Sequence, residues 1–560
     1  MRRGVTITPG LSPRQAAAPA RVHRPFVANL TLLSSVVVAF GVVAGQLIYL
    51  GTNSGPQLSI AVTEAAATSF ARPDIIDRNG RLLATDVEAP SLFADPAILI
   101  DKDEAVEKLA TVFSDLDQAE LRRALSDKTR RFVWVRRGLS PAVAQRIHNL
   151  GLPGLSFRKE LRRAYPAGEL AGHVIGSVNL DNKGTSGIEK YIDDAIGVEA
   201  VHGATLSDRA PVRLALDLGV QHALEDELET AFRRYHTEGA AGLVLDVKTG
   251  EIVASASMPK IDPSRPGATL DPHSIDRISG GSYELGSVFK TITVAMALDA
   301  GTANAATVLD VRQPLVSGRF TISDLHPAGR PLTVAEVFTH SSNVGAAMMA
   351  LEAGPEKVSG FFKRAGLLDA MKTEAGPVSP PQVPQKWQEL ELITTSYGHS
   401  IAVAPIQFAA AAAALVNGGT TVTPTFLRYR SGSATTPTTL VSADISREIA
   451  RLMRLNVLDA DGTGKRADVA GYRVGGKTGT AERASEGGYQ KKAVISSFLA
   501  TFPSDEPRYL TFVLLFEPDG ISETNGQRTA STNAAPVTAR LIRRIAPQLG
   551  VAPQETALTE

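Results

Sequence analysis

Ser287-Val288-Phe289-Lys290 is the stretch that decides the fold, because two further motifs follow it in a fixed order. These are Ser341-Ser342-Asn343 and Lys477-Thr478-Gly479-Thr480, so the chain carries S-x-x-K, S-x-N and K-T-G in succession. On a helix, Ser287 and Lys290 lie three positions apart and share one face. A serine hydroxyl becomes a good nucleophile only when a nearby base takes its proton. A lysine can be that base where burial or a neighbouring cation lowers the pKa of its ammonium.

Each pattern also occurs elsewhere in the chain, and the surrounding residues separate the functional set from chance matches. Ser257 and Lys260 fit S-x-x-K, but Pro259 between them opposes the helix that would bring them together. Lys248-Thr249-Gly250 lies between two alternating apolar runs and therefore predicts a hairpin turn. The run from Val288 to Leu298 contains no glycine or proline, which favours a helix there.

Further motifs accompany these three in one order along the chain. They are Arg72-Pro73-Asp74-Ile75-Ile76-Asp77-Arg78-Asn79-Gly80, Arg163-Ala164-Tyr165-Pro166, Gly184-Thr185-Ser186-Gly187-Ile188-Glu189, Tyr283-Glu284-Leu285-Gly286, Tyr397-Gly398-His399, Pro405-Ile406-Gln407 and Asn417-Gly418-Gly419. With this set, the chain resembles the class B penicillin-binding proteins, and most closely their septal, FtsI-type transpeptidases. The resemblance runs from about Ala71 to about Ile545. Ser400 stands where the family usually has a glycine, so the resemblance does not define the backbone conformation at this position.

Composition places the chain among globular proteins of more than one domain. A length of 560 residues predicts two or three domains, and 43% hydrophobic with 21% charged residues is typical of a folded protein. Lys+Arg 58 balances Asp+Glu 58, so we expect no nucleic-acid partner. The absence of cysteine excludes disulfides and thiolate metal sites. The ten histidines show no metal-binding spacing, and we expect neither a metal nor a cofactor.

The N-terminal region predicts a membrane anchor. Residues 1–25 are rich in Ala, Pro and Arg and predict a cytoplasmic tail, while residues 26–50 carry no charge and predict a transmembrane helix. Arginines on the N-terminal side place that end in the cytoplasm. A cleaved signal peptide is the alternative, since Val43-Ala44-Gly45 offers small residues to a peptidase, although the apolar run is long for one.

The rest of the chain divides into two predicted domains and a tail. Residues 60–215 mix strand-like and helical segments without a nucleophile set, and we interpret them as an elongated, non-catalytic α/β pedestal. The pattern of residues 216–548 predicts strands, then a helical block and then strands again. Residues 549–560 are expected to form a frayed C-terminal tail. The expected elements are helices at 285–300, 334–340, 344–352, 405–416 and 535–545, paired strands at 495–502 and 509–516, and a loop at 482–492.

The resemblance implies a similar architecture for the two predicted domains. It implies an α+β transpeptidase domain, with an antiparallel sheet flanked by helices and an all-helical subdomain. The pedestal corresponds to the dimerisation-type domain of penicillin-binding proteins.

Chemical roles follow for the first two motifs. Ser287 is expected to be the acylated nucleophile, near a helix N-terminus whose dipole favours an oxyanion. Lys290 is the expected general base for acylation. Ser341 would relay a proton to the leaving amine, and Asn343 would hold the substrate's amide. The structural alternative for Ser341 and Asn343 is a plain N-cap of the following helix.

The third motif is expected to bind the substrate's carboxylate. Lys477 would supply a fixed positive charge that binds this carboxylate and helps to keep Lys290 neutral. Gly479 would let a substrate backbone lie against the strand. The resemblance implies that Thr478 and Thr480 bind the carboxylate, and that the N–H groups of Thr480 and Ser287 form the oxyanion hole.

The reaction that the resemblance implies is peptidoglycan cross-linking. Ser287 attacks the carbonyl between two D-alanines of a stem peptide, and an amine of a neighbouring stem peptide then takes the acyl group. D,D-carboxypeptidase activity is a possible side reaction, and β-lactams would block the serine. The resemblance places the catalytic domain in the periplasm of a single-pass inner-membrane protein at the division septum. A SEDS-type polymerase of lipid-linked glycan and other divisome membrane proteins are the implied partners.

Four alternatives stay open at this point. An elongation-type transpeptidase would share the motifs, and a non-catalytic division scaffold would tolerate their loss. A membrane-bound β-lactam sensor would need several spans and a cytoplasmic effector. A β-lactamase would not need the pedestal. The intact motif set favours an enzyme over a scaffold.

Overall fold

The computed structural model describes residues 37–46, 68–202, 206–265, 267, 272–428, 437–485 and 488–554. The chain divides into two units, Met1–Ala66 and Ala67–Glu560. In the first unit residues 37–46 are helical, and the rest of the predicted span at 26–50 lies outside the described residues. Among the helices that are described, none combines the length and the apolar composition needed to cross a membrane.

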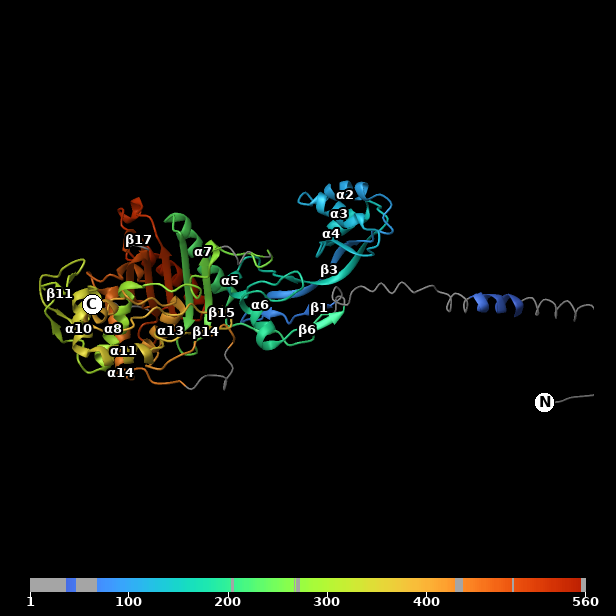
Figure 1. Cartoon of the computed structure of the whole chain (residues 1–560). Helices are drawn as coiled ribbons and strands as arrows, with labels where there is room; N and C mark the ends of the chain where they lie inside the picture. Colours follow the sequence, from blue (N-terminus) through green and yellow to red (C-terminus); the bar gives the residue numbers. More distant parts are fainter. Residues whose placement is uncertain are drawn as a thin grey trace, which may run out of the picture. The chain divides into compact units, whose positions relative to one another are not determined.

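A five-stranded antiparallel sheet forms the centre of the C-terminal part of the chain (Figure 1). Its order is β16 (Gly475–Ser485), β17 (Gly488–Phe502), β18 (Tyr509–Phe516), β8 (Gly239–Asp246) and β9 (Ile252–Met258). Every residue of β8, β9 and β18 is buried, because helices cover both faces of the sheet. The predicted pairing of the strands at 495–502 and 509–516 and the predicted hairpin at Lys248-Thr249-Gly250 are confirmed.

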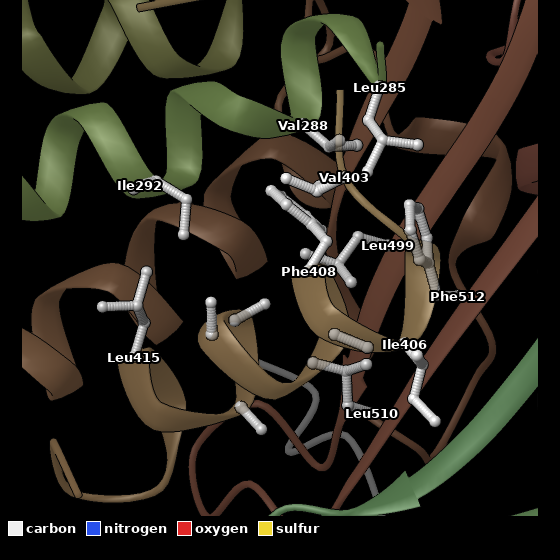
Figure 2. Packing of buried hydrophobic residues seen from close by; sticks show 14 of the residues in the cluster. Leu285, Val288, Ile292, Val403, Ile406, Phe408, Leu415, Leu499, Leu510 and Phe512 are labelled. Atoms are coloured by element: carbon white, nitrogen blue, oxygen red, sulfur yellow. The ribbon is translucent and has the colours of Figure 1, made fainter. Parts of the chain in front are cut away.

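Two pairs of helices cover the two faces of the sheet. They are α7 (Leu218–Arg234) with α15 (Ala534–Gln548) on one face, and α8 (Lys290–Asp299) with α13 (Pro405–Val416) on the other. Figure 2 shows Ile406 and Phe408 of α13 packed among Leu499, Leu510 and Phe512 of the strands. The predicted antiparallel sheet flanked by helices is therefore confirmed.

The composition of α13 explains its place in the core. Pro405 stands at the start of the helix, where a missing N–H costs nothing, and every residue of the helix is buried. Six consecutive alanines follow Phe408 and allow the neighbouring helices to approach closely. The bounds are those predicted from the sequence.

The helical block around α8 and α13 contains several elements that the sequence predicted and some that it did not. The elements are the 3-10 turn η5 (Gly286–Phe289), α9 (Val334–Thr339), α10 (Asn343–Ala353), α11 (Pro355–Arg364), α12 (Glu389–Thr395) and α14 (Ala443–Leu458). Thr333 and Glu336 form a capping box that starts α9. Helices α11, α12 and α14 were not predicted, and the helix expected at 285–300 begins as η5.

The pedestal is built on a long central strand, β3 (Leu82–Ala94), which pairs with β5 (Leu155–Ala164) and β4 (Val133–Arg136). The other elements of this part are β1 (Thr68–Ala71), β2 (Ile75–Ile76), α2 (Lys102–Ala110), α3 (Gln118–Ser126), α4 (Pro141–His148), α5 (Gly172–Ile175), α6 (Gly187–Tyr191), η2 (Ile192–Ile196), β6 (Glu199–His202) and β7 (Val212–Arg213). Helices α2 to α4 close a separate hydrophobic cluster over β3 and β4.

Three of the matching motifs meet in a buried ion-pair network of the pedestal. Glu189 accepts from Arg72 Nε at 2.8 Å and from Arg163 Nε at 2.7 Å. Arg163 also donates to Asp86 at 3.1 Å. The side chains of Arg72, Arg163 and Glu189 are fully buried, so each charge depends on its partners rather than on water.

Two expectations about irregular segments are wrong. Strands β16 and β17 continue through most of the predicted loop at 482–492 as a hairpin, with a register shift between Glu482 and Arg483. The start of the predicted frayed tail is packed, because the N–H of Val551 donates to Ala546 and that of Gln554 donates to Gly471. Residues 555–560 lie outside the described part of the chain.

Removing the central carboxylate of the pedestal network should be strongly destabilising. Glu189→Gln leaves two buried guanidinium groups without their shared counterion, and we expect a loss of about 3–5 kcal/mol in the free energy of unfolding. Glu88→Gln is the matched control, since Glu88 forms an exposed pair with Lys159 and should change stability by about 0–1 kcal/mol. Urea unfolding of the purified full chain measures both, and equal losses in the two variants would contradict this account.

Candidate active site

The nucleophile motif lies on a tight turn pressed against β16. Ser287 belongs to η5 and Lys290 is the first residue of α8, with 2.9 Å between Lys290 Nζ and Ser287 Oγ. In a 3-10 turn, residues three apart are eclipsed, which aligns these two side chains. Gly286 has φ +60°, and a Cβ there would lie 2.7 Å from the carbonyl oxygen of Thr480. Only glycine permits this approach of η5 to the strand.

The second motif meets Lys290 from the start of α10. Lys290 Nζ lies 2.5 Å from the carbonyl oxygen of Ser341, 3.1 Å from Ser341 Oγ and 2.7 Å from Asn343 Oδ1. Ser341 has φ +61° and stands outside the helix. The N-cap is Ser342, whose Oγ accepts from Gly345 N at 3.0 Å. Ser341 is therefore not the plain N-cap of the structural alternative.

These contacts define what Lys290 can do. The carbonyl oxygens of Ser341 and Asn343 can only accept, so they take two N–H groups of the amine. The lone pair of a neutral lysine is then left to accept a hydrogen bond from the Ser287 hydroxyl, which lies 2.9 Å from Nζ. Burial, and then the neighbouring Lys477, hold the pKa of Lys290 well below its ordinary value, while Asp324 opposes the shift.

Lys477 completes the cluster from β16. Its Nζ lies 3.0 Å from Ser341 Oγ and 5.8 Å from the ring centre of Phe338, and the side chain is fully buried. Burial lowers the pKa of Lys477 to about 7. Burial therefore works against the fixed positive charge that is expected of Lys477 in the free protein. A carboxylate bound beside Lys477 would raise the pKa again, because it favours the charged form.

Gly479 is required by the packing of the protein itself, in addition to the role toward a substrate backbone that is expected of it. A Cβ at this position would lie 2.5 Å from the carbonyl oxygen of Leu285 and 2.5 Å from Ser497 Oγ. The missing side chain thus makes room for the protein's own nucleophile turn beneath the strand. The glycine sets the distance between η5 and β16.

The threonines of the third motif have partners that the sequence analysis missed. Thr478 Oγ1 donates to Thr463 Oγ1 at 2.8 Å, and Thr463 Oγ1 donates to Asn456 Oδ1 at 3.1 Å. Asn456, fully buried on α14, also donates to the carbonyl oxygen of Gly476 at 2.8 Å. Thr480 Oγ1 accepts from the backbone of Ala530 at 3.4 Å. The signal available in the sequence was Gly462-Thr463-Gly464 directly after an amphipathic segment.

The Tyr397-Gly398-His399 segment supports the nucleophile turn from the other side. A Cβ at Gly398 would lie 2.3 Å from the carbonyl oxygen of Gly286. Ser400, which replaces the usual glycine, has φ +57° and donates its N–H to Glu284 Oε1 at 2.8 Å. The serine therefore adopts the left-handed backbone that a glycine favours.

The chance matches to the motifs have structural roles. Ser257 lies on β9 and donates to Asp276 at 2.9 Å, while Lys260 pairs with Glu229 at 2.8 Å. Within the described ranges, no group of three or more His, Asp and Glu side chains could hold a metal ion.

A cavity of about 750 Å³ lies beside the nucleophile turn. Tyr283 and Glu284 line it just before the turn, and Glu482 lines it just beyond Thr480 on β16. Gln382 and Ser400 belong to the same lining. The lining therefore includes residues that lie next to the first and third motifs in the sequence, but none of the motif residues themselves.

Comparison with known proteins identifies the family. The family described as the penicillin binding protein transpeptidase domain matches residues 240–543, and the penicillin-binding protein dimerisation domain matches residues 68–200. The chain belongs to the penicillin-binding transpeptidases. It is similar to the probable peptidoglycan D,D-transpeptidase FtsI of Caulobacter vibrioides, with 39% identity over 494 residues, 87% of this chain and 83% of that protein.

Two more distant relatives agree with this assignment. The probable peptidoglycan D,D-transpeptidase PenA of Neisseria gonorrhoeae is 29% identical over 540 residues, 90% of this chain and 91% of that protein. The peptidoglycan D,D-transpeptidase FtsI of Escherichia coli K12 is 28% identical over 527 residues, 87% of each chain. The resemblance to class B, FtsI-type penicillin-binding proteins is confirmed.

The charge of Lys477 should control the first, non-covalent binding of a penicillin. With a pKa of about 7 in the free protein, Lys477 loses its proton as the pH rises through this value, and binding of the penicillin carboxylate should weaken. Lys477→Arg stays protonated and should remove this pH dependence, whatever its size does to the acylation rate. Stopped-flow kinetics separates the dissociation constant from the acylation rate at each pH. The same weakening in Lys477→Arg would contradict the assignment.

Proposed function

We propose that this chain is a serine D,D-transpeptidase that cross-links peptidoglycan stem peptides at the division septum through an acyl-enzyme on Ser287. The observation that carries the proposal is the convergence on Lys290 Nζ of Ser287 Oγ, Ser341 Oγ and Asn343 Oδ1. This arrangement provides a nucleophile, a buried base and a second hydroxyl for proton transfer. Similarity to the peptidoglycan D,D-transpeptidases supports the same conclusion.

In the acylation step, neutral Lys290 takes the proton of Ser287 while Oγ attacks the carbonyl carbon between two D-alanines. The N–H groups of Ser287 and Thr480 stabilise the resulting oxyanion. Ser341 Oγ lies within 3.1 Å of Lys290 Nζ, so it can pass the proton to the leaving amine. The C–N bond breaks, the terminal D-alanine leaves, and the acyl group stays on Ser287.

In the second step, an amine of a neighbouring stem peptide attacks the acyl carbon. Its proton returns through Lys290 to Ser287 Oγ as the ester bond breaks and the new amide forms. Lys477, Thr478 and Thr480 hold the carboxylate of the donor before it leaves. Water in place of the amine would give the D,D-carboxypeptidase side reaction.

The cellular setting is part of the proposal. The uncharged run at 26–50, preceded by arginines, supports a single span with a cytoplasmic N-terminus and a periplasmic catalytic domain. The names of the FtsI relatives support a role at the division site. We infer a SEDS-type glycan polymerase and other divisome membrane proteins as partners, with the pedestal as the contact surface.

Penicillin should form one covalent adduct, on Ser287. Intact mass spectrometry of the treated protein should show a single penicilloyl group, and Ser287→Ala should abolish it because the nucleophile is gone. Ser257→Ala is the matched control and should keep full labelling, since Ser257 is occupied by its bond to Asp276. An adduct that survives in Ser287→Ala would overturn the assignment of the nucleophile.

Depleting the protein from growing cells should produce long filaments of normal width that lack septa. The reason is that a septal enzyme limits division without limiting elongation. Light microscopy with a cell-wall stain distinguishes this from rounded or widened cells. Rounded or widened cells would show that the protein acts in the elongation machinery, without changing the proposed chemistry.

A further inference from the structure

The cavity beside the nucleophile turn is large enough for a ligand and is lined mainly by polar residues. Its volume of about 750 Å³ falls within the range of small-molecule sites in proteins. Three acidic residues belong to the lining, namely Glu284, Glu391 and Glu482. Among the described residues of the lining, Lys386 is the one basic side chain. The cavity therefore carries an excess of negative charge, which favours a cationic ligand.

Glu391 gives an independent reason to expect a cation. It lies in the first turn of α12, and its Oε2 is buried without a hydrogen-bond partner. Within the described part of the chain, no cation lies within ion-pair distance of this carboxylate. A carboxylate that is partly removed from water without a counterion is unfavourable, and a cation bound in the cavity relieves this cost.

Glu284 brings a second carboxylate to the cavity from the segment that precedes the nucleophile. Its Oε1 accepts from the N–H of Ser400 at 2.8 Å, and His399 Nδ1 lies 3.4 Å from its Oε2. Ser400 belongs to the lining as well. These contacts hold the carboxylate three residues before Ser287, so one charged wall of the cavity is part of the segment that carries the nucleophile.

Strand β16 indicates which part of a substrate reaches the cavity. Lys477 and Thr478 are expected to hold the terminal carboxylate of the donor, and the N–H of Thr480 its scissile carbonyl. A donor that lies along the open edge of the strand therefore continues past Thr480 toward Glu482 with the residues that precede the scissile bond. Because Glu482 belongs to the lining, the cavity lies on the acyl side of the scissile bond.

The donor stem peptide carries a cation on this side. In the proposed reaction the amine of one stem peptide attacks the acyl group of another, so the donor carries the same amine as the acceptor. Since the leaving residue is D-alanine, this amine lies on the acyl side. An ammonium in an acidic cavity keeps its proton and has no lone pair with which to attack the acyl carbon. The acceptor amine, in contrast, must be neutral when it attacks.

We propose that the cavity is a subsite for the side-chain ammonium of the donor stem peptide, in which the carboxylates of Glu284 and Glu391 hold this group in its charged, non-nucleophilic form. The inference rests on the proposed function, because it concerns the donor that acylates Ser287. It assigns a binding role to a cavity that lies outside the three motifs.

The test is competition of two peptides with a fluorescent penicillin for Ser287, measured on the full chain in detergent. N-acetyl-lysyl-D-alanyl-D-alanine carries a free side-chain ammonium, and the same peptide acetylated on that amine does not. We expect the free peptide to inhibit labelling at a concentration about tenfold lower, because a charge-assisted bond in the cavity is lost on acetylation. Glu391→Gln should remove most of this difference and leave inhibition by the acetylated peptide unchanged.

Two further variants control for the change at Glu391. Glu389→Gln removes an exposed carboxylate from the same turn of α12, outside the described lining, and should keep the wild-type difference between the peptides. Lys386→Gln removes the cation of the lining and should increase the difference, which also tests the proposal should Glu391→Gln fail to fold. A purely structural role of Glu391 would weaken inhibition by both peptides equally.

The outcomes separate this inference from the proposed function. Equal inhibition by the two peptides, including none by either, overturns the inference, and so does an unchanged difference in Glu391→Gln. The free peptide with its terminal carboxylate converted to an amide cannot bind as a donor. Inhibition by this amide that depends on Glu391 would assign the subsite to the acceptor and overturn the donor assignment. A wild-type protein that penicillin does not label, or a Ser287→Ala variant that it does, would instead overturn the proposed function.

Discussion

The burial of the Lys290 amine is the constraint on which the active site depends. An ammonium without water is costly, so burial favours the neutral amine, and only the neutral amine can take a proton from Ser287. Its two N–H groups still need acceptors, which the carbonyl oxygens of Ser341 and Asn343 supply. The turn η5, the start of α10 and strand β16 must therefore meet around one nitrogen atom.

Glycines make this meeting possible. Side chains at Gly286, Gly398 or Gly479 would each collide with backbone atoms of the neighbouring segment. The nucleophile turn is consequently held between β16 and the segment that ends at Ser400, with almost no space on either side. Strand β16 lies at the edge of its sheet, which leaves one side of its backbone available to an extended peptide. Rigid packing on one side and an open edge on the other are what a peptide-binding serine enzyme requires.

The residues of this site that belong to short motifs were predicted from the sequence. The residues that act through tertiary contacts were not. The order of the three motifs indicated which residues meet, and α13 was predicted to the residue because a proline, an apolar run and two glycines mark its ends. Asp324 and Asn456 gave no comparable signal, since their partners come from distant segments. The burial of Lys477 was missed for the same reason, because complete burial cannot be read from the sequence of a strand that lies at a sheet edge.

The chain buries two kinds of cation, and the contrast explains why the two sites behave differently. In the pedestal, burial lowers the pKa of Arg163, but the carboxylates of Glu189 and Asp86 lie against it and raise the pKa above its ordinary value. In the catalytic site, neither Lys290 nor Lys477 has a carboxylate within ion-pair distance among the described residues, and burial lowers the pKa of both. Guanidinium groups that share carboxylate partners suit a permanent structural network, whereas a buried ammonium can lose its proton. Burial therefore leaves a charged ion pair where carboxylates surround the cation, and it favours a neutral base where no carboxylate lies within ion-pair distance.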